Sequence, residues 1–294
     1  MKLFDDHQLF YKANFHTHTS ESDGRLSPEE SMRAYRERGY DILALTDHRK
    51  VTVPEHVPEG LLMIPGIEMD FIYHQQVIHL LGLGMDAAIG EKYKLCKTPQ
   101  QVINTVKRLG GRVILAHPAW SLNTPEYMAS LKGLWGAEVW NSVSTLPYNA
   151  MRADSSSLLD VTASKGQILP MFANDDTHHY GSELAAGWNM IQAEELTVPA
   201  VMAAVDQGRM YATQGPEIRQ IEVEQGVMRV SCSPAKAIIF YSSRTWVKGR
   251  SHVGEGLTSA EYTLSPADGF VRVQIIDAEG KSAWSSPVAV STLL

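Results

Sequence analysis

The stretch NFHTHTSESDG, residues 14–24, places His16 and His18 two positions apart and follows them with Asp23 in a turn-prone sequence. In an extended strand, side chains two positions apart project from the same face, so the two imidazoles point the same way. Imidazole and carboxylate groups are ligands that suit Zn²⁺, Mn²⁺ and Fe²⁺. Because an H-x-H pair also arises by chance, the metal hypothesis depends on further donors elsewhere in the chain.

Further donors occur where predicted apolar strands end or run through a core. They are His48, Glu68, His79, His117, Asp176 and His178. Each one alone is more often a capping, packing or solvated residue, but a histidine inside an apolar strand needs a polar partner. With His16, His18 and Asp23, the set uses six of the eleven histidines and three carboxylates. Nine donors exceed the four positions around a tetrahedral ion, which predicts a centre of two to three Zn, Mn or Fe ions.

The segment NDDTHH, residues 174–179, offers two alternative sets of donors. Asp176 and His178 are two apart and share one face, whereas Asp175 and His179 project from the other face. We predict that the first set binds metal. His179 is then either a contact to the leaving group of a substrate or an exposed loop histidine.

The elements that position these residues alternate between helix and strand patterns. Helix signals include SPEESMRAYRERGY, with Ser27 as a cap before Pro28, and TPQQVINTVKRLGG, which ends in a glycine pair. Apolar strands such as DILALTDH and RVILAHPAW end in the polar residues. This alternation predicts an α/β fold with mainly parallel strands covered by helices, and α/β barrels carry their chemistry at the carboxyl ends of the strands. After residue 214 short alternating runs predict a small antiparallel domain of β-sandwich type at 215–294, which leaves 1–214 as the larger α/β domain.

The bulk composition is that of a soluble globular protein. The chain has 294 residues, 44% hydrophobic and 20% charged, and no apolar run approaches the roughly 20 residues of a membrane span. A net charge of −7 argues against an extended nucleic-acid surface. Two cysteines give no disulfide framework, and the beginning MKLFDDHQLF is acidic where a signal peptide is basic. We therefore expect a cytoplasmic protein, and the oligomeric state stays open.

The ordered motifs HTH, SDG, TDH, GIE, IHLLG, AHP and DDTH resemble the pattern of the polymerase and histidinol phosphatase (PHP) superfamily. The resemblance covers roughly residues 13–214 and implies a distorted (β/α)7 barrel with up to three metal ions. It also implies three ligand sets. These are His16, His18, Glu68 and Asp176 for the first ion, Glu68, His79 and His117 for the second, and Asp23, His48 and His178 for the third.

Three divalent ions bring more positive charge than three carboxylates and a bridging hydroxide remove, which favours an anionic substrate. We expect a phosphoesterase that hydrolyses a small phosphorylated metabolite or nucleotide by attack of a metal-bridging hydroxide, with Glu68 holding two ions. Arg25 and Arg49 follow ligand motifs and are candidate phosphate contacts, and Asn141 is a weaker candidate. The alternatives are a metallohydrolase of carboxylic or carbamate esters, a 5'-3' exonuclease acting on short oligonucleotides, and a domain without catalytic activity.

Overall fold

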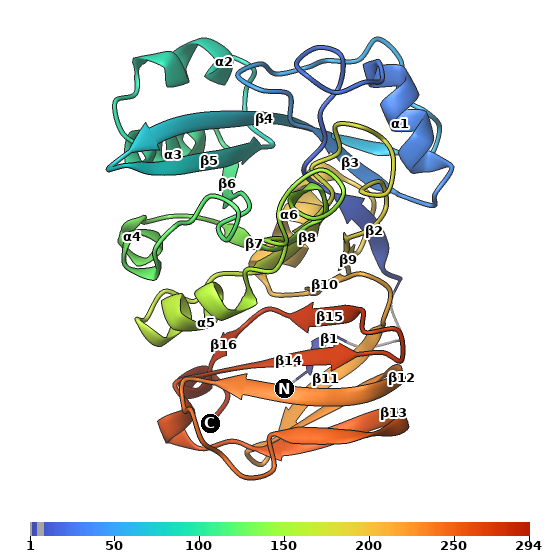
Figure 1. Ribbon diagram of the computed structural model, residues 1–294, viewed down its shortest axis with the longest axis vertical. Coiled ribbons are helices and arrows are strands. Elements are labelled where there is room, and N and C mark those ends of the chain that lie inside the picture. The colour runs from blue at the N-terminus through green and yellow to red at the C-terminus, as the bar shows by residue number, and fades with distance from the viewer. Residues whose placement is uncertain (1, 5–8) are drawn as a thin grey trace.

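The computed structural model describes residues 2–4 and 9–294 (Figure 1). Residues 5–8 of the acidic beginning of the chain lie outside the described part. The described residues form six α-helices. They are α1 Pro28–Arg36, α2 Ile89–Lys92, α3 Pro99–Arg108, α4 Pro125–Ser130, α5 Ser156–Ser164 and α6 Val198–Asp206. The strands before residue 214 are β1 Lys2–Phe4, β2 Tyr11–Asn14, β3 Ile42–Leu45, β4 Leu62–Tyr73, β5 Gln76–Leu83, β6 Arg112–Leu115, β7 Gly136–Asn141, β8 Met171–Asn174, β9 Trp188–Ile191 and β10 Met210–Thr213.

Local signals in the sequence determine where several helices begin. Ser27 caps α1 in a reciprocal capping box, in which its side chain accepts from the Glu30 backbone while Glu30 accepts from the Ser27 backbone. Thr98 and Thr197 cap α3 and α6 in the same position, each followed by a proline in the first turn. The beginnings expected for α1 and α3 are confirmed, and in all three helices the caps satisfy backbone N–H groups that no helical partner reaches.

The strand order around the sheet is only partly parallel. The pairs β2–β3, β3–β4, β6–β7 and β7–β8 are parallel, but β5 is antiparallel to both of its neighbours. His74 and Gln75 alone separate β4 from β5, with φ of 49° and 62°. Two residues can close a hairpin but cannot make the crossover that parallel strands need. The expectation of mainly parallel strands is therefore corrected at this hairpin and again at β9, which is antiparallel to both β2 and β10.

The chain segments that follow β2 and β8, the first and last strands of this series, are joined by backbone hydrogen bonds. Beyond the ends of β2 and β8, Thr17 and Thr177 form a parallel bridge, and His18 N–H donates to the Thr177 carbonyl at 3.0 Å. Asp176 N–H donates to the His16 carbonyl at 2.9 Å. These bonds place the HTH and DDTHH segments side by side, although 160 positions separate them in the sequence.

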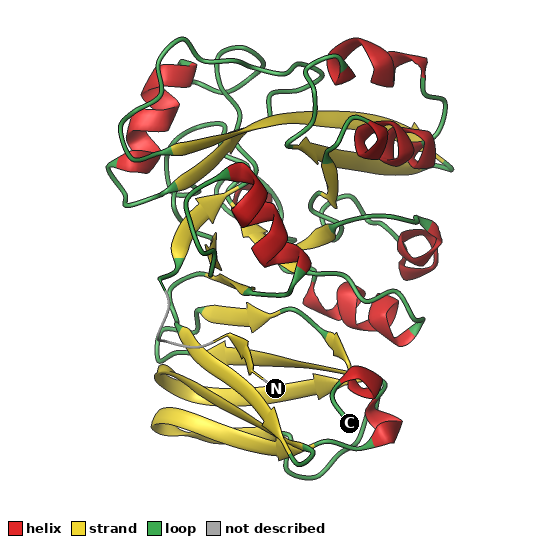
Figure 2. Ribbon diagram, turned by 180° about the vertical axis from the view of Figure 1, so that it is seen from behind, coloured by secondary structure: helices red, strands yellow, loops and turns green. Residues whose placement is uncertain are grey.

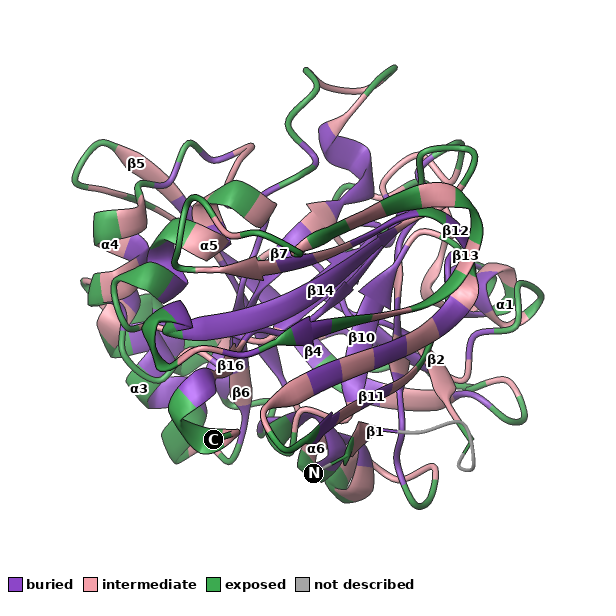
Figure 3. Cartoon of the chain, turned by 90° about the horizontal axis from the view of Figure 1, so that it is seen from below, coloured by how far each residue is buried: buried purple, intermediate pink, exposed green. Residues whose placement is uncertain are grey.

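The strands after residue 214 form the lower part of the molecule in Figures 1 and 2. They are β11 Ile218–Glu224, β12 Val227–Ser242, β13 Ser251–Thr263, β14 Phe270–Ile276, β15 Ser282–Ser285 and β16 Val288–Ala289. All their pairings are antiparallel, as the alternating pattern predicted. β14 is buried along nearly its whole length, whereas β13 is a mainly exposed edge strand (Figure 3). Among the described residues, no helix is both long and apolar enough to cross a membrane.

The later strands are joined to the earlier ones by backbone pairing and by buried side chains. β10 pairs with β15, and β1 pairs with β11. Arg272 on β14 is 1% exposed and donates to both carboxylate oxygens of Asp160 on α5, at 2.6 and 2.7 Å. Trp284 on β15 packs into the same core as Met171 on β8. The division into units at 1–214 and 215–294 stays a prediction.

Asn189 should be a sensitive position for stability. Its buried side-chain amide joins β9 to β8 by accepting from the Ala173 N–H at 3.0 Å and donating to the Ala173 carbonyl at 2.8 Å. Asn189→Ala leaves both backbone groups without these partners, and each loss costs about 1–3 kcal/mol. We expect a clear fall of the unfolding midpoint in urea. The control Asn104→Ala, on the exposed face of α3, should change stability by less than about 0.5 kcal/mol. Equal midpoints for the two variants would contradict this role.

Candidate metal centre

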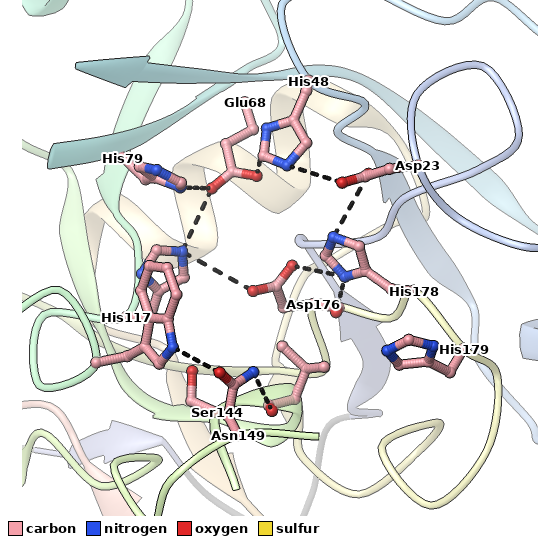
Figure 4. A pocket seen from close by; sticks show the side chains of 12 residues that line it. Asp23, His48, Glu68, His79, His117, Ser144, Asn149, Asp176, His178 and His179 are labelled. Atoms are coloured by element: carbon pink, nitrogen blue, oxygen red, sulfur yellow. Dashed lines mark hydrogen bonds and ion pairs between the residues drawn. The ribbon is translucent and has the colours of Figure 1, made fainter. Parts of the chain in front are cut away.

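The nine predicted donors converge at one place, and the structure groups them into three sets (Figure 4). Within each set, one potential ligand atom of every residue lies within 4.8 Å of the others. The sets are His16, His18, Glu68 and Asp176; Glu68, His79 and His117; and His18, Asp23, His48 and His178. The first two coincide with the sets implied by the PHP resemblance, and the third adds His18 to the expected three residues. The residues come from the carboxyl ends of β2, β3, β6 and β8 and from the hairpin of β4 and β5.

Glu68 on β4 is the common member of the first two sets. Its side chain is 1% exposed, and its Oε2 atom lies 3.2 Å from His16 Nε2 and 3.0 Å from His18 Nε2. Its Oε1 atom lies 2.7 Å from His79 Nδ1 and 3.4 Å from His117 Nε2. One carboxylate oxygen therefore faces each set, which is the arrangement a carboxylate needs in order to bridge two ions.

Three buried atoms in the first set lack a hydrogen-bond partner among the described residues. They are His16 Nε2, His18 Nε2 and Asp176 Oδ1. The nitrogens lie 3.1 and 3.0 Å from that oxygen without hydrogen-bond geometry, so all three atoms are directed toward a common space. Buried polar atoms are almost always satisfied, and a divalent ion would satisfy all three at once. The donor set therefore fits a metal ion.

The electrostatic balance of the cluster leads to the same conclusion. Burial opposes protonation of His16, but the carboxylates of Asp176, Glu68 and Glu138 outweigh it and raise its pKa well above the usual value. Burial likewise opposes ionisation of Glu68, but His16, His117 and His18 hold its pKa well below the usual value. The buried carboxylates thus require nearby positive charge, which protons on the histidines or bound cations can supply.

Glu138, which the sequence reasoning missed, supports the ligands from behind. This residue on β7 is fully buried, and its Oε1 atom lies 2.8 Å from His16 Nδ1. Its Oε2 atom accepts from the backbone N–H of His117 and from Asn141 Nδ2, both at 2.8 Å. A carboxylate on the outer nitrogen fixes the ring orientation and leaves Nε2 directed inward. The signal in the sequence was a lone acid within the apolar strand GAEVWN.

Two of the predicted ligands lie on strained backbone. His117 has φ of 30° and Asp176 has φ of 54°, in the left-handed region that residues other than glycine rarely adopt. Such strain is concentrated at functional sites, where the surrounding structure enforces it. The neighbouring Asp175 points away from the cluster and accepts from the backbone N–H groups of residues 185–187 and from Tyr35. Asp176 and His178 therefore lie on the face that the DDTHH register predicted.

The predicted substrate contacts occupy different environments. Arg25 is exposed beside His178, and its guanidinium makes no hydrogen bond or ion pair with any described residue. Arg49 is held in a bidentate pair with Asp70 at 2.7 and 2.6 Å. Asn141 is fully buried and donates to Glu138 and Asp176, so it lies behind the ligands rather than in the cavity. His179 is not in any of the three sets, but it lines the cavity over them.

A cavity of about 260 Å³ lies over the cluster. Part of the lining consists of predicted ligands, among them His79, His117 and His178. The rest consists of Trp120, Val143, Ser144, Asn149 and His179; Figure 4 labels Ser144, Asn149 and His179. Apart from His179, these further residues were missed by the sequence reasoning, because they come from loops with no distinctive motif. The cavity can therefore place a small substrate directly against the donor cluster.

We expect Glu138→Gln to weaken metal binding. The variant keeps the size of the side chain but removes the charge that orients His16, and such outer contacts typically contribute 10–100-fold to metal affinity. Titration of chelator-treated protein with Zn²⁺ or Mn²⁺ would measure the change. Glu255→Gln on the exposed edge strand β13 is the charge-matched control. Unchanged affinity in Glu138→Gln would show that this carboxylate does not orient the ligand.

Comparisons with known proteins give partial sequence matches and one extensive structural match. No protein-family model matches the chain. It is 34% identical over 82 residues to the 5'-3' exoribonuclease Rnm of Salmonella typhimurium, covering 26% of this chain and 28% of that protein. It is 32% identical over 80 residues to Rnm of Escherichia coli, covering 25% and 27%. The match thus spans less than a third of either relative.

The structural match spans both parts of the chain. It is to a two-domain protein from Bacteroides vulgatus that contains a predicted PHP-like metal-dependent phosphoesterase. The TM-score is 0.56 at 16% identity, and the match covers 93% of this chain and 92% of the other. The PHP resemblance predicted from residues 13–214 is confirmed at the level of the fold. This chain therefore has the fold of the PHP-like proteins.

Proposed function

We propose that this protein is a metal-dependent phosphoesterase that binds two to three Zn, Mn or Fe ions through the nine donors. The observation that carries the proposal is the position of Glu68, which faces two ligand sets at once and is fully buried between them. When bound, paired divalent ions activate water and stabilise the charge on a transferring phosphoryl group. With three ions bound, their six positive charges exceed the negative charges of the three ligand carboxylates, so an anionic phosphoester suits such a centre.

The reaction we propose is hydrolysis of one phosphoester bond. A water oxygen forms a new bond to phosphorus, the bond from phosphorus to the leaving oxygen breaks, and that oxygen takes up a proton. His179 lines the cavity next to His178, and its ring makes no hydrogen bond with the described residues. Its imidazole is free to donate the proton, which supports the predicted contact to the leaving group.

The substrate we favour is a small phosphorylated metabolite or nucleotide, because the cavity is small and the net charge is −7. The 5'-3' exonuclease alternative gains support from the partial match to Rnm of two bacteria. The small-molecule phosphoesterase and the exonuclease hypotheses share one site and one reaction, so they differ only in the group that is attached to the phosphate. Preference for a carboxylic or carbamate ester over every phosphoester would favour the remaining alternative.

Glu68→Gln tests the proposed centre. The variant removes the charge that faces two sets, so we expect hydrolysis of a phosphoester panel with added Mn²⁺ or Zn²⁺ to fall by at least about a hundredfold, or about 2.7 kcal/mol. The exposed Glu59→Gln should keep wild-type activity. Circular dichroism would check that both variants are folded. Activity of Glu68→Gln within about tenfold of the wild type would rule out the bridging role.

The two candidate arginines should behave differently. The Arg25 guanidinium has no hydrogen-bond or ion-pair partner among the described residues, whereas Arg49 is already bound to Asp70. A hydrogen bond to a charged group contributes about 1.5–3 kcal/mol, so Arg25→Ala should lower kcat/KM for the best phosphoester by about 10–150-fold. Arg49→Ala should change it by less than about threefold, like the control Arg219→Ala on β11. Wild-type efficiency in both Arg25→Ala and Arg49→Ala would exclude either residue as the phosphate contact.

A further inference from the structure

A second cavity, of about 470 Å³, lies beside α3. The helices α2 and α3 are neighbours (Figure 1), and three cationic residues line the cavity between and along them. Lys92 ends α2, Lys97 lies in the loop before α3, and Arg108 ends α3. This cavity shares no lining residue with the one over the metal cluster. A molecule bound here would therefore occupy a separate site.

The charge of this region is opposite to that of the whole chain. Residues 92–108 contain five of the 26 lysines and arginines and none of the 33 aspartates and glutamates. They carry +5, which leaves −12 for the rest of a chain whose net charge is −7. The described residues that line the cavity include no acid, and Lys92, Lys97 and Arg108 form no ion pair with any described residue. A hollow lined by charges of one sign concentrates their field and attracts ions of the opposite sign.

The side-chain amides of the cavity add donors rather than acceptors. Gln101 Oε1 accepts from the Lys97 N–H at 2.6 Å, and Asn104 Oδ1 accepts from Gln100 Nε2 at 3.1 Å. Both amide oxygens are thus occupied, while the amide N–H groups of Gln101 and Asn104 have no partner among the described residues. The cavity therefore presents N–H donors together with positive charge, a combination that suits the oxygens of an anion.

These donors form a line rather than a single cluster. Gln101, Asn104 and Arg108 are spaced three and four positions apart, so they share one face of α3. At about 1.5 Å per residue this face is about 10 Å long, which is longer than one phosphate group. Arg108 Nη2 donates to Thr105 Oγ1 at 3.0 Å, and this bond holds the guanidinium against the same face. The arrangement suits a linear ligand with several anionic groups.

We propose that this cavity is a second ligand site, which binds a small molecule carrying two or more linked phosphate groups. The guanidinium of Arg108 presents a fixed fork of donors to phosphate oxygens, and the ammonium groups of Lys92 and Lys97 act as point charges. The amide N–H groups of Gln101 and Asn104 donate to further oxygens of the chain. This site goes beyond the proposed phosphoesterase function, because none of its residues belongs to the metal centre.

Cys96 gives a local readout of ligand binding. Its thiol lines the cavity, whereas Cys232, the other cysteine of the chain, is 1% exposed. In metal-loaded protein, tripolyphosphate should slow the alkylation of Cys96 by iodoacetamide at least about fivefold, because the bound anion covers the thiol. At constant ionic strength, half-maximal protection by orthophosphate should need at least about a tenfold higher concentration. Labelling of Cys232 would report unfolding, and metal content measured afterwards would check that the centre is intact.

A triple variant tests the three cations. Lys92→Gln, Lys97→Gln and Arg108→Gln together should raise the tripolyphosphate concentration for half-maximal protection at least about tenfold, since charged contacts to the phosphates are lost. Protection is measured relative to the rate of each variant without anion. The control removes three exposed cations elsewhere and should keep half-maximal protection within about twofold of the wild type. It carries Lys236→Gln, Lys248→Gln and Lys281→Gln.

Gln101→Glu tests the donor that the cavity offers. The variant keeps an oxygen for the Lys97 N–H but replaces the amide N–H group by a second oxygen that repels phosphate. Half-maximal protection should again need at least about a tenfold higher concentration of tripolyphosphate. Gln225→Glu, exposed in the turn between β11 and β12, makes the same change of charge elsewhere and should behave like the wild type.

Three results would overturn the proposal. They are unchanged alkylation of Cys96 at about 10 mM tripolyphosphate, equal loss of protection in both triple variants, and equal protection by orthophosphate. Methyl triphosphate would identify the form of the ligand, since protection by it indicates an ester of the chain and protection by tripolyphosphate alone indicates the free anion. The measurement uses no hydrolysis, so its failure would leave the proposed phosphoesterase function intact, and inactivity toward phosphoesters would leave this site intact.

Discussion

The burial of the Glu68 carboxylate is the constraint on which the rest of this structure depends. A buried charge is costly unless charges of the opposite sign surround it, and five histidines lie within 3.4 Å of its two oxygens. Asp176 and Glu138 add two more buried carboxylates to the same volume. So much negative charge in one place is stable only with protons or metal ions between the groups, so the folded state requires either protonated histidines or bound cations here.

This constraint explains why the backbone is irregular where the ligands lie. The predicted donors lie on or directly after six strands, and their side chains all point into one small volume. Regular strand geometry alone does not orient all of these side chains toward it. The positive φ angles at His117 and Asp176 and the bridge between Thr17 and Thr177 redirect the chain at those points. Hydrogen bonds from the surroundings hold the strained segments, such as the bond from His117 N–H to Glu138. The strained backbone and the hydrogen bonds that stabilise it thus occur at the same residues.

The sequence was informative where the signal is local. Spacing of two positions oriented His16 with His18 and Asp176 with His178, and capping residues such as Ser27 located helix beginnings. The sequence was uninformative where a strand or side chain has a partner that is distant along the chain. A strand pattern does not identify its neighbour, so the antiparallel hairpin of β4 and β5 was not foreseen. Glu138 was missed because its role depends on His16, which lies 122 positions away.

The strands after residue 214 have a structural role that follows from their contacts. Arg272 binds Asp160 on α5, the helix that follows β7 and the loop carrying Val143 and Asn149. Ser286 accepts from the Met171 N–H at 3.1 Å, at the beginning of the strand that leads to Asp176. These strands therefore support β7 and β8 from the side opposite the cavity. The candidate metal ligands of this chain thus lie on one set of strands, and the strands after residue 214 pack against elements that carry or flank them.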